Sequence, residues 1–271
     1  MSRSLMDQHD GVLFDLDGVL YAGPRAVDGA VSALEELRRR ETPCGFVTNN
    51  ASRSAEEIAA HLNDLGMVAS ASEVFGSAPA GVALMGREVP AGAKVMVTGS
   101  AYLRQLVEAA GYRVVDSAAA RPAAVIQGFD PQLRWTDLAE AAFAVNDGAR
   151  WFATNLDMTI PREHGIAPGN GALVETIGRA TGTIPTAAGK PEPLLFQQAA
   201  ESLGLQAPLV IGDRLDTDIL GGNRARFTTV LVLTGIDSRE SAAAADTAHR
   251  PDHVIDSLSE LFAEDPAGAV T

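Results

Sequence analysis

Two aspartates separated by one residue follow the first apolar segment of the chain, in the stretch Asp15-Leu16-Asp17-Gly18. The apolar run at 11–14 before them predicts a short β-strand. Because side chains alternate along an extended chain, positions i and i+2 face the same way, so both carboxylates are expected to point into one site. Gly18 frees the backbone to turn behind them. Such a pair suits a nucleophile, Asp15, and a general acid or base, Asp17.

Further polar segments follow other predicted strands or precede a helix. Thr48 and Asn49 follow a second strand, Lys190 precedes a helix, and Asp213 and Asp218 follow a fourth strand. In open parallel α/β sheets, ligands bind beyond the carboxyl ends of the strands. The sequence therefore predicts one crevice that receives polar groups from four separate segments.

This set of groups fits phosphate monoester hydrolysis, which needs a barrier lowered by on the order of 20 kcal/mol or more. Phosphoryl transfer to Asp15, followed by attack of water, divides the reaction into two steps. Asp17 can protonate the leaving alkoxide and later take a proton from water, and neighbouring carboxylates are expected to raise its pKa. Lys190, Thr48 and backbone amides can stabilise charge on the transferring oxygens.

Crowded carboxylates repel each other, at about 4 kcal/mol for two charges ~4 Å apart in an effective dielectric near 20. A divalent cation removes this penalty. Asp15 and Asp213 supply oxygen ligands, and Mg²⁺ fits better than Ca²⁺ because it takes one or two carboxylates together with substrate phosphate. Asp218 is expected not to bind the metal directly but to orient Lys190 or a metal-bound water.

Composition limits the classes of partner. The formal charge is -14, and 38–40 is the main basic cluster, which argues against nucleic acid and anionic membranes as partners. No run approaches the ~20 apolar residues of a spanning helix, and 1–10 lacks the pattern of a signal peptide. Cys44 is the single cysteine, so a disulfide within the chain is excluded, and we expect it to be a buried packing residue. These features predict a cytoplasmic protein.

Short apolar runs alternate with segments of helical period, which predicts an α/β fold with a doubly wound, Rossmann-like parallel sheet. A new α/β pattern starts near residue 94 and ends before the first pattern resumes near 189. We therefore expect a core domain at 1–90 and 188–271, with a smaller α/β cap domain inserted at 91–187.

The four segments together resemble the motifs of the haloacid dehalogenase-type phosphatase superfamily, and the match covers essentially the whole chain. The insertion resembles the C2-type cap of its NagD-like branch, and the pattern that includes 48–54 and 155–157 is most similar to actinobacterial glycerol-3-phosphate phosphatases. The resemblance implies the roles of individual residues. Asp15 would be the nucleophile and Asp17 the acid or base; Mg²⁺ would be bound by Asp15, the Asp17 carbonyl and Asp213; and phosphate would be held by Thr48, Asn49 and Lys190.

A cap that excludes macromolecules and water favours a small phosphorylated metabolite as substrate. Candidates for contact with its leaving group are four residues of a polar, Gly/Pro-rich loop, namely Asn155, Asp157, Arg162 and His164. The sequence does not set the oligomeric state, and a homo-oligomer remains open.

Three alternatives compete with the phosphatase. A phosphomutase on the same core would isomerise a sugar phosphate without releasing phosphate. A receiver-type phospho-acceptor is a single small domain and lacks a second aspartate two residues after the acceptor. A dinucleotide site rests only on Gly169-Asn170-Gly171, which lacks a third glycine and a suitable preceding strand.

Overall fold

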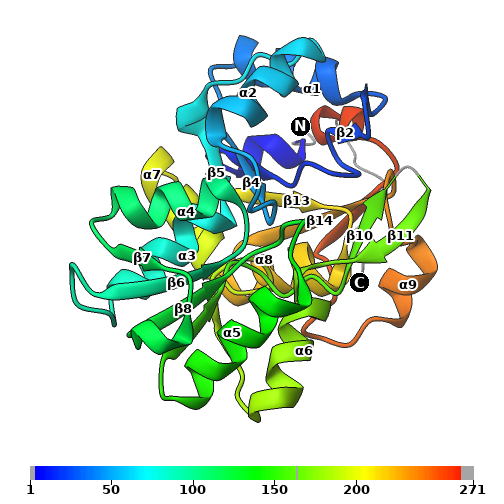
Figure 1. Cartoon of the computed structure of the whole chain (residues 1–271). Coiled ribbons are helices and arrows are strands. Elements are labelled where there is room, and N and C mark those ends of the chain that lie inside the picture. Colours follow the sequence, from blue (N-terminus) through cyan, green and yellow to red (C-terminus); the bar gives the residue numbers. More distant parts are fainter. Residues whose placement is uncertain (1–3, 163, 264–271) are drawn as a thin grey trace. The chain divides into compact units, whose positions relative to one another are not determined.

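The computed structural model describes residues 4–162 and 164–263 (Figure 1). It divides the chain into two compact units, which we describe separately. As far as they are described, the first unit contains Met1–Thr48, Ala55–Phe75 and Lys190–Thr271, and the second contains Asn49–Ser54 and Gly76–Gly189. The chain therefore leaves the first unit and returns to it twice.

The first unit is built on a six-stranded parallel sheet in the order β15-β14-β13-β1-β4-β5. Strand order reverses between β1 and its neighbour β13, and such a switch point is where ligands bind in doubly wound sheets. The predicted doubly wound core is confirmed. The strands are β1 (Val12–Phe14), β4 (Cys44–Thr48), β5 (Val74–Gly76), β13 (Leu209–Gly212), β14 (Thr228–Val232) and β15 (His253–Ile255).

Helices cover both faces of this sheet (Figure 1). On one face, Val12 and Phe14 pack in a core with Leu34 of α1 and Leu62 of α2. On the other face, Leu231 packs with residues of the segments that follow β13 and β14, and α7 contacts β1 and β4. The helices are α1 (Ala30–Arg39), α2 (Ala55–Asp64), α7 (Leu194–Leu203), α8 (Leu220–Ala225) and α9 (Arg239–Ala244).

Short elements complete the first unit. They are a β2 (Tyr21–Ala22) and β3 (Arg25–Ala26) hairpin, one π-helical turn at Leu215–Ile219, and 3₁₀ turns at Leu5–Gln8, Ala71–Glu73 and Leu258–Phe262. Cys44 at the start of β4 is buried, as predicted, and burial raises the pKa of its thiol to about 11.

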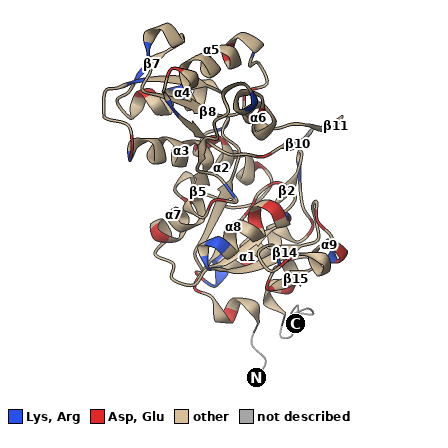
Figure 2. Ribbon diagram, turned by 90° about the horizontal axis from the view of Figure 1, so that it is seen from below, with Lys and Arg blue, Asp and Glu red and all other residues tan. Residues whose placement is uncertain are grey.

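The arginines at 38–40 lie at the C-terminal end of α1, where basic residues gather in Figure 2. Carboxylates neutralise them. Arg38 pairs with Glu73 at 2.6 Å, and Arg40 pairs with Glu36 at 2.6 Å. This basic cluster is therefore a paired helix end.

The second unit contains a five-stranded parallel sheet in the order β12-β9-β8-β6-β7. Along β8, Ala124 and Ile126 face the core formed with α3 and α4, whereas Val125 faces the core formed with α5 and α6. The elements are β6 (Lys94–Thr98), β7 (Arg113–Val115), β8 (Ala124–Gln127), β9 (Arg150–Ala153), β12 (Thr186–Ala187), α3 (Ser77–Gly86), α4 (Ala101–Ala109), a 3₁₀ turn (Ala118–Ala120), α5 (Trp135–Asn146) and α6 (Asn170–Thr181).

The limits of the second unit differ from the insertion expected at 91–187, because the unit also includes α3. That helix packs against α4, β8 and β9. The polar loop expected around residue 160 instead contains an antiparallel hairpin of β10 (Thr159–Arg162) and β11 (Gly165–Pro168). Among the described residues, no helix combines the length and the apolar character needed to cross a membrane.

Candidate active site

Asp15 lies directly beyond the end of β1, in the middle of the first unit's sheet. Its backbone N–H donates to the Ile211 carbonyl at 2.8 Å, which extends the pairing of β1 with β13 by one step. Leu16 is buried in the apolar core, whereas Asp17 is exposed. The structure therefore gives the two aspartates different environments: Asp15 is 9% exposed and Asp17 is open to solvent.

Lys190 carries the cation at the centre of the site. Its Nζ lies 2.5 Å from Asp15 Oδ1 and 2.7 Å from Asp218 Oδ1, and it donates to the Val47 carbonyl at 3.3 Å. The side chain is 3% exposed. The ends of β1 and β4, the segment before α7 and the turn after β13 thus meet at one ammonium group, to which β4 contributes the Val47 carbonyl.

Asp213 and Asp218 both lie in the segment after β13 and are almost fully buried. The Ile236 N–H donates to Asp213 Oδ2 at 2.9 Å, and the Arg214 N–H donates to Asp218 Oδ2 at 3.2 Å. Asp213 fits only because glycines surround it. A Cβ on Gly235 would lie 1.9 Å from Asp213 Oδ2, and one on Gly18 would lie 2.4 Å from it.

Burial and mutual repulsion control the charges of these acids. Burial, followed by repulsion from Asp218 and Asp15, raises the pKa of Asp213 to about 8. Burial raises the pKa of Asp218 to about 6 and also raises the pKa of Asp15, in both cases against the attraction of Lys190. Burial favours the neutral amine of Lys190, but the two carboxylates outweigh it and raise its pKa.

The same acids form a set of oxygen ligands suited to a metal ion. One carboxylate oxygen from each of Asp15, Asp213 and Asp218 lies within 4.8 Å of the others. Asp213 Oδ1 is buried and has no hydrogen-bond partner among the described residues. Because a buried carboxylate oxygen without a partner is costly, this atom is a natural cation ligand.

The two residues predicted to follow β4 at the phosphate site have different surroundings. Thr48 is buried at the end of β4 in the first unit. Asn49 belongs to the second unit, where its side-chain amide donates to Asp157 Oδ1 at 2.8 Å. Their roles in phosphate binding stay predictions.

The four residues expected to contact a leaving group are not equivalent. Asn155 is buried, and its amide donates to the Asn49 carbonyl at 2.8 Å, while Asp157 accepts from Asn49. His164 is exposed in the turn between β10 and β11. Arg162 ends β10, and its side chain lies outside the described part of the chain.

The sequence interpretation missed the segment after β14. The Thr234 hydroxyl donates to the Gly18 carbonyl at 2.7 Å, the Asp237 N–H donates to the Asp213 carbonyl at 3.0 Å, and Gly235 and Ile236 contact the Asp213 carboxylate. The sequence carried part of the signal, because Thr234-Gly235 follows an apolar strand; that this strand neighbours β13 is seen only in the structure.

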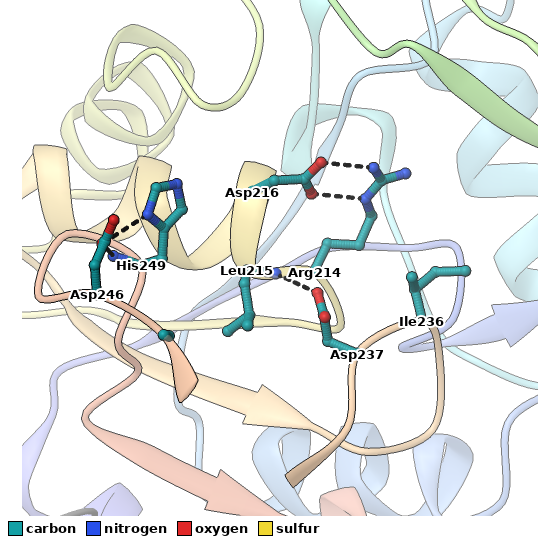
Figure 3. Close-up of a pocket in the computed structure, with 8 residues that line it drawn as sticks. Arg214, Leu215, Asp216, Ile236, Asp237, Asp246 and His249 are labelled. Carbon is teal, nitrogen blue, oxygen red and sulfur yellow. Dashed lines mark hydrogen bonds and ion pairs between the residues drawn. The ribbon is translucent and has the colours of Figure 1, made fainter. Parts of the chain in front are cut away.

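A hollow of about 430 Å³ lies beside the Asp213 segment (Figure 3). Its charged side chains are paired locally: Arg214 with Asp216 at 2.9 Å, and His249 with Asp246 at 2.8 Å. We therefore place the chemistry at Lys190 and not in this hollow. It is lined by Arg214, Leu215, Asp216, Ile236, Asp237, Ala245, Asp246 and His249.

Comparison with known proteins agrees with this geometry. A family model described as haloacid dehalogenase-like hydrolase matches residues 12–113, and a second model, described as HAD-hydrolase-like, matches 187–261. D-glycerol 3-phosphate phosphatase from Mycobacterium tuberculosis is 42% identical over 268 residues, which are 99% of this chain and 75% of that protein. This chain belongs to the haloacid dehalogenase-like hydrolase family.

Two further comparisons cover most of both chains. Acid sugar phosphatase from Staphylococcus saprophyticus is 35% identical over 261 residues, 96% of this hydrolase and 99% of that protein. The crystal structure of glycerol phosphate phosphatase from Mycobacterium tuberculosis in complex with magnesium has a TM-score of 0.94 at 42% identity, covering 100% of this chain and 82% of that one. The predicted superfamily and its NagD-like branch are confirmed, and this hydrolase is a phosphatase.

The dinucleotide alternative is not supported by the structure. Gly169 precedes α6 directly after the antiparallel β10–β11 hairpin, whereas a dinucleotide fingerprint follows a strand of a parallel sheet.

Proposed function

We propose that this hydrolase is a magnesium-dependent phosphatase that releases phosphate from a small monoester through an aspartyl-phosphate, a mixed anhydride formed on Asp15. The observation that carries the proposal is the position of Lys190, whose ammonium group lies between the carboxylates of Asp15 and Asp218 at the end of β1. A fixed cation beside a nucleophilic carboxylate supports transfer of an anionic phosphoryl group.

The residues present fit magnesium. Asp15 and Asp213, with the main-chain carbonyl of Asp17, would hold it, because the unpartnered Asp213 Oδ1 offers a hard oxygen ligand. Bound there, the ion would offset the repulsion between carboxylates and the negative charge of the phosphoryl group. Asp218 stays paired with Lys190 and holds it in place.

In the first step, a carboxylate oxygen of Asp15 attacks phosphorus, and the bond from phosphorus to the leaving oxygen breaks. Burial raises the pKa of Asp15, and Lys190 opposes this effect and favours the ionised carboxylate. Asp17 gives its proton to the leaving oxygen, a role that suits an exposed carboxyl two residues from the nucleophile. Thr48 and Lys190 bind the transferring oxygens.

In the second step, water attacks the phosphorus of the aspartyl-phosphate, and the bond from phosphorus to the Asp15 oxygen breaks, which restores the Asp15 carboxylate. Asp17, now ionised, takes the proton from that water, so the acid of the first step is the base of the second. The products are the free alcohol and inorganic phosphate, and both carboxyl groups return to their starting states.

We further propose glycerol 3-phosphate as the substrate, and the second unit as the cap that restricts access to small molecules. The 42% identity to the D-glycerol 3-phosphate phosphatase of Mycobacterium tuberculosis supports this choice. A cytoplasmic location, as the single buried cysteine suggests, and a homo-oligomeric state stay predictions.

The test is release of inorganic phosphate with Mg²⁺ from a panel of glycerol 3-phosphate, phosphoglycolate, nitrophenyl phosphate, pyridoxal phosphate and nucleoside monophosphates. We expect release that EDTA abolishes and added Mg²⁺ restores, with the highest kcat/KM on glycerol 3-phosphate. Conversion of a sugar phosphate without phosphate release would favour the phosphomutase. No release from any ester would overturn the proposed function.

A further inference from the structure

Asn49 is held by three side chains of the second unit. Its carbonyl oxygen accepts hydrogen bonds from Ser77 Oγ and from Asn155 Nδ2, both at 2.8 Å. Its side-chain Nδ2 donates to Asp157 Oδ1, also at 2.8 Å. Ser77 is fully buried and Asn155 is 3% exposed, so the two bonds to the Asn49 carbonyl are shielded from water and are costly to break.

Asn49 also contacts the segment by which the chain leaves the second unit. The Gly189 N–H donates to the Thr154 carbonyl at 2.8 Å, and a Cβ on Gly189 would lie 2.5 Å from Asn49 Oδ1. Asn49 directly follows Thr48, and Gly189 directly precedes Lys190. One cluster in the second unit therefore fixes two backbone segments, each one peptide bond from a residue assigned to the phosphate.

The loop that carries Asn155 and Asp157 is itself fixed by the start of α6. Asn170 Nδ2 donates to the Asn155 carbonyl at 2.7 Å, and the Gly171 N–H donates to the Asp157 carbonyl at 2.8 Å. A Cβ on Gly169 would lie 2.3 Å from the Asp157 carbonyl oxygen. Gly169-Asn170-Gly171 is thus required for close packing against this loop, which explains the motif without a nucleotide.

We propose that Asn155 and Asp157 are positioning residues that hold Asn49, and with it the backbone that directly follows Thr48 and directly precedes Lys190, the residues proposed to bind phosphate. The proposal rests on the proposed phosphatase function. It replaces the expected contact with a leaving group, because both polar atoms of the Asn155 side chain and Asp157 Oδ1 have partners within the second unit. Asn155 Nδ2 donates to the Asn49 carbonyl, Asn155 Oδ1 accepts from the Asp157 N–H at 3.2 Å, and Asp157 Oδ1 accepts from Asn49.

A positioning residue and a leaving-group contact predict different kinetics. Asp157→Ala removes the acceptor for Asn49, and Asn155→Asp replaces a donor with a carboxylate that repels the Asn49 carbonyl. We expect each to lower kcat/KM by about 10-fold to about 100-fold, as a misplacement of roughly 1 Å can do. The loss should be equal for glycerol 3-phosphate and nitrophenyl phosphate, since both share the phosphoryl group only.

Three further variants separate positioning from general damage. Asp157→Asn keeps an oxygen acceptor for Asn49 and should restore most of the activity lost in Asp157→Ala. Ser77→Ala removes one of two donors to the same oxygen and should cause a smaller loss. Asp116→Ala is the matched control, because its exposed carboxylate pairs with Arg104 in the same unit and should leave both kcat and KM unchanged.

Binding of inorganic phosphate gives a readout without turnover. Measured by calorimetry in the presence of Mg²⁺, the Kd for phosphate should rise in Asp157→Ala and in Asn155→Asp. If Asp157 acts through Asn49, the double variant Asn49→Ala/Asp157→Ala should bind phosphate no more weakly than Asn49→Ala alone. The proposal would be overturned if Asp157→Ala and Asn155→Asp unfolded at the wild-type temperature and also kept the wild-type Kd for phosphate and the wild-type kcat/KM. So would a loss confined to one ester. An inactive wild-type enzyme would instead overturn the proposed function.

Discussion

Lys190 Nζ lies 2.5 Å from Asp15 Oδ1 and 2.7 Å from Asp218 Oδ1, with all three side chains buried. Lys190→Met would leave two buried carboxylates without their cation. We expect it to lower the free energy of unfolding by about 3–5 kcal/mol, measured by urea denaturation in EDTA. In Lys190→Met/Asp218→Asn the loss should be less than the sum of the two single losses, because one uncompensated charge is removed. Wild-type stability in Lys190→Met would contradict this pairing.

Asp15→Asn should abolish turnover while the fold remains intact. The amide has the shape of the carboxylate but lacks its nucleophilic charge, so phosphate release should fall at least about 10,000-fold, as removal of a covalent nucleophile does elsewhere. Circular dichroism should match the wild type. Asp116→Asn, at an exposed aspartate, serves as the control. Retained activity in Asp15→Asn would refute the proposed aspartyl-phosphate.

Asp17→Asn tests the acid role through the leaving group. A poor alkoxide leaving group needs a proton, whereas nitrophenolate leaves readily without one. We therefore expect kcat to fall more for glycerol 3-phosphate than for nitrophenyl phosphate. Equal losses on both esters would remove Asp17 from that role.

Gly235→Ala should weaken magnesium binding, because the added methyl would lie 1.9 Å from Asp213 Oδ2 and must displace the carboxylate. We expect the Mg²⁺ concentration for half-maximal activity to rise by about 10-fold or more, corresponding to about 1.4 kcal/mol of binding energy. Gly81→Ala is the matched control, since its methyl would find no atom closer than 3.5 Å. An unchanged Mg²⁺ requirement in Gly235→Ala would show that Asp213 does not bind the ion.

Stabilisation by magnesium should increase with pH. In the metal-free protein the pKa of Asp213 is about 8, against the usual 3.8. Between pH 3.8 and about pH 8 the folded state keeps a proton on Asp213 that the unfolded chain has lost. The contribution of Asp213 to the free energy of unfolding therefore falls as pH rises. Magnesium competes with that proton, so the gain in Tm at a fixed, sub-saturating Mg²⁺ concentration should grow from about pH 6 to about pH 8. Asp213→Asn should remove this dependence, and a gain that falls with pH would contradict the assignment.

The sequence was sufficient to predict the parts of the site that follow from strand order. Asp15, Thr48 and Asp213 each follow an apolar strand of a parallel sheet, and carboxyl ends of such strands share one edge. Lys190 was recognised because its segment precedes a helix in the same pattern. These predictions depend on local pattern and one topological rule, and the structure brings Asp15, Lys190 and Asp213 together accordingly.

Other features depend on contacts that local pattern does not reveal. The helix α3 contains Pro79 and Gly81 and buries residues on most of its surface, so it shows neither strong helical propensity nor an apolar stripe. The hydrogen bond between Asn49 and Asp157 joins positions 108 residues apart. The Gly235 contact with Asp213 similarly requires that β14 lie beside β13.

Asp15 and Lys190 are 175 positions apart, and β1 pairs with β13 only after the chain has passed through the second unit. During translation β1 and β4 leave the ribosome early, but their neighbour β13 is made after β12, the last strand of the second unit's sheet. Because domains fold as units while the chain is made, we expect the second unit to be folded on the ribosome while Asp15 still lacks its cation. The nascent chain would therefore become active only when its final third has emerged.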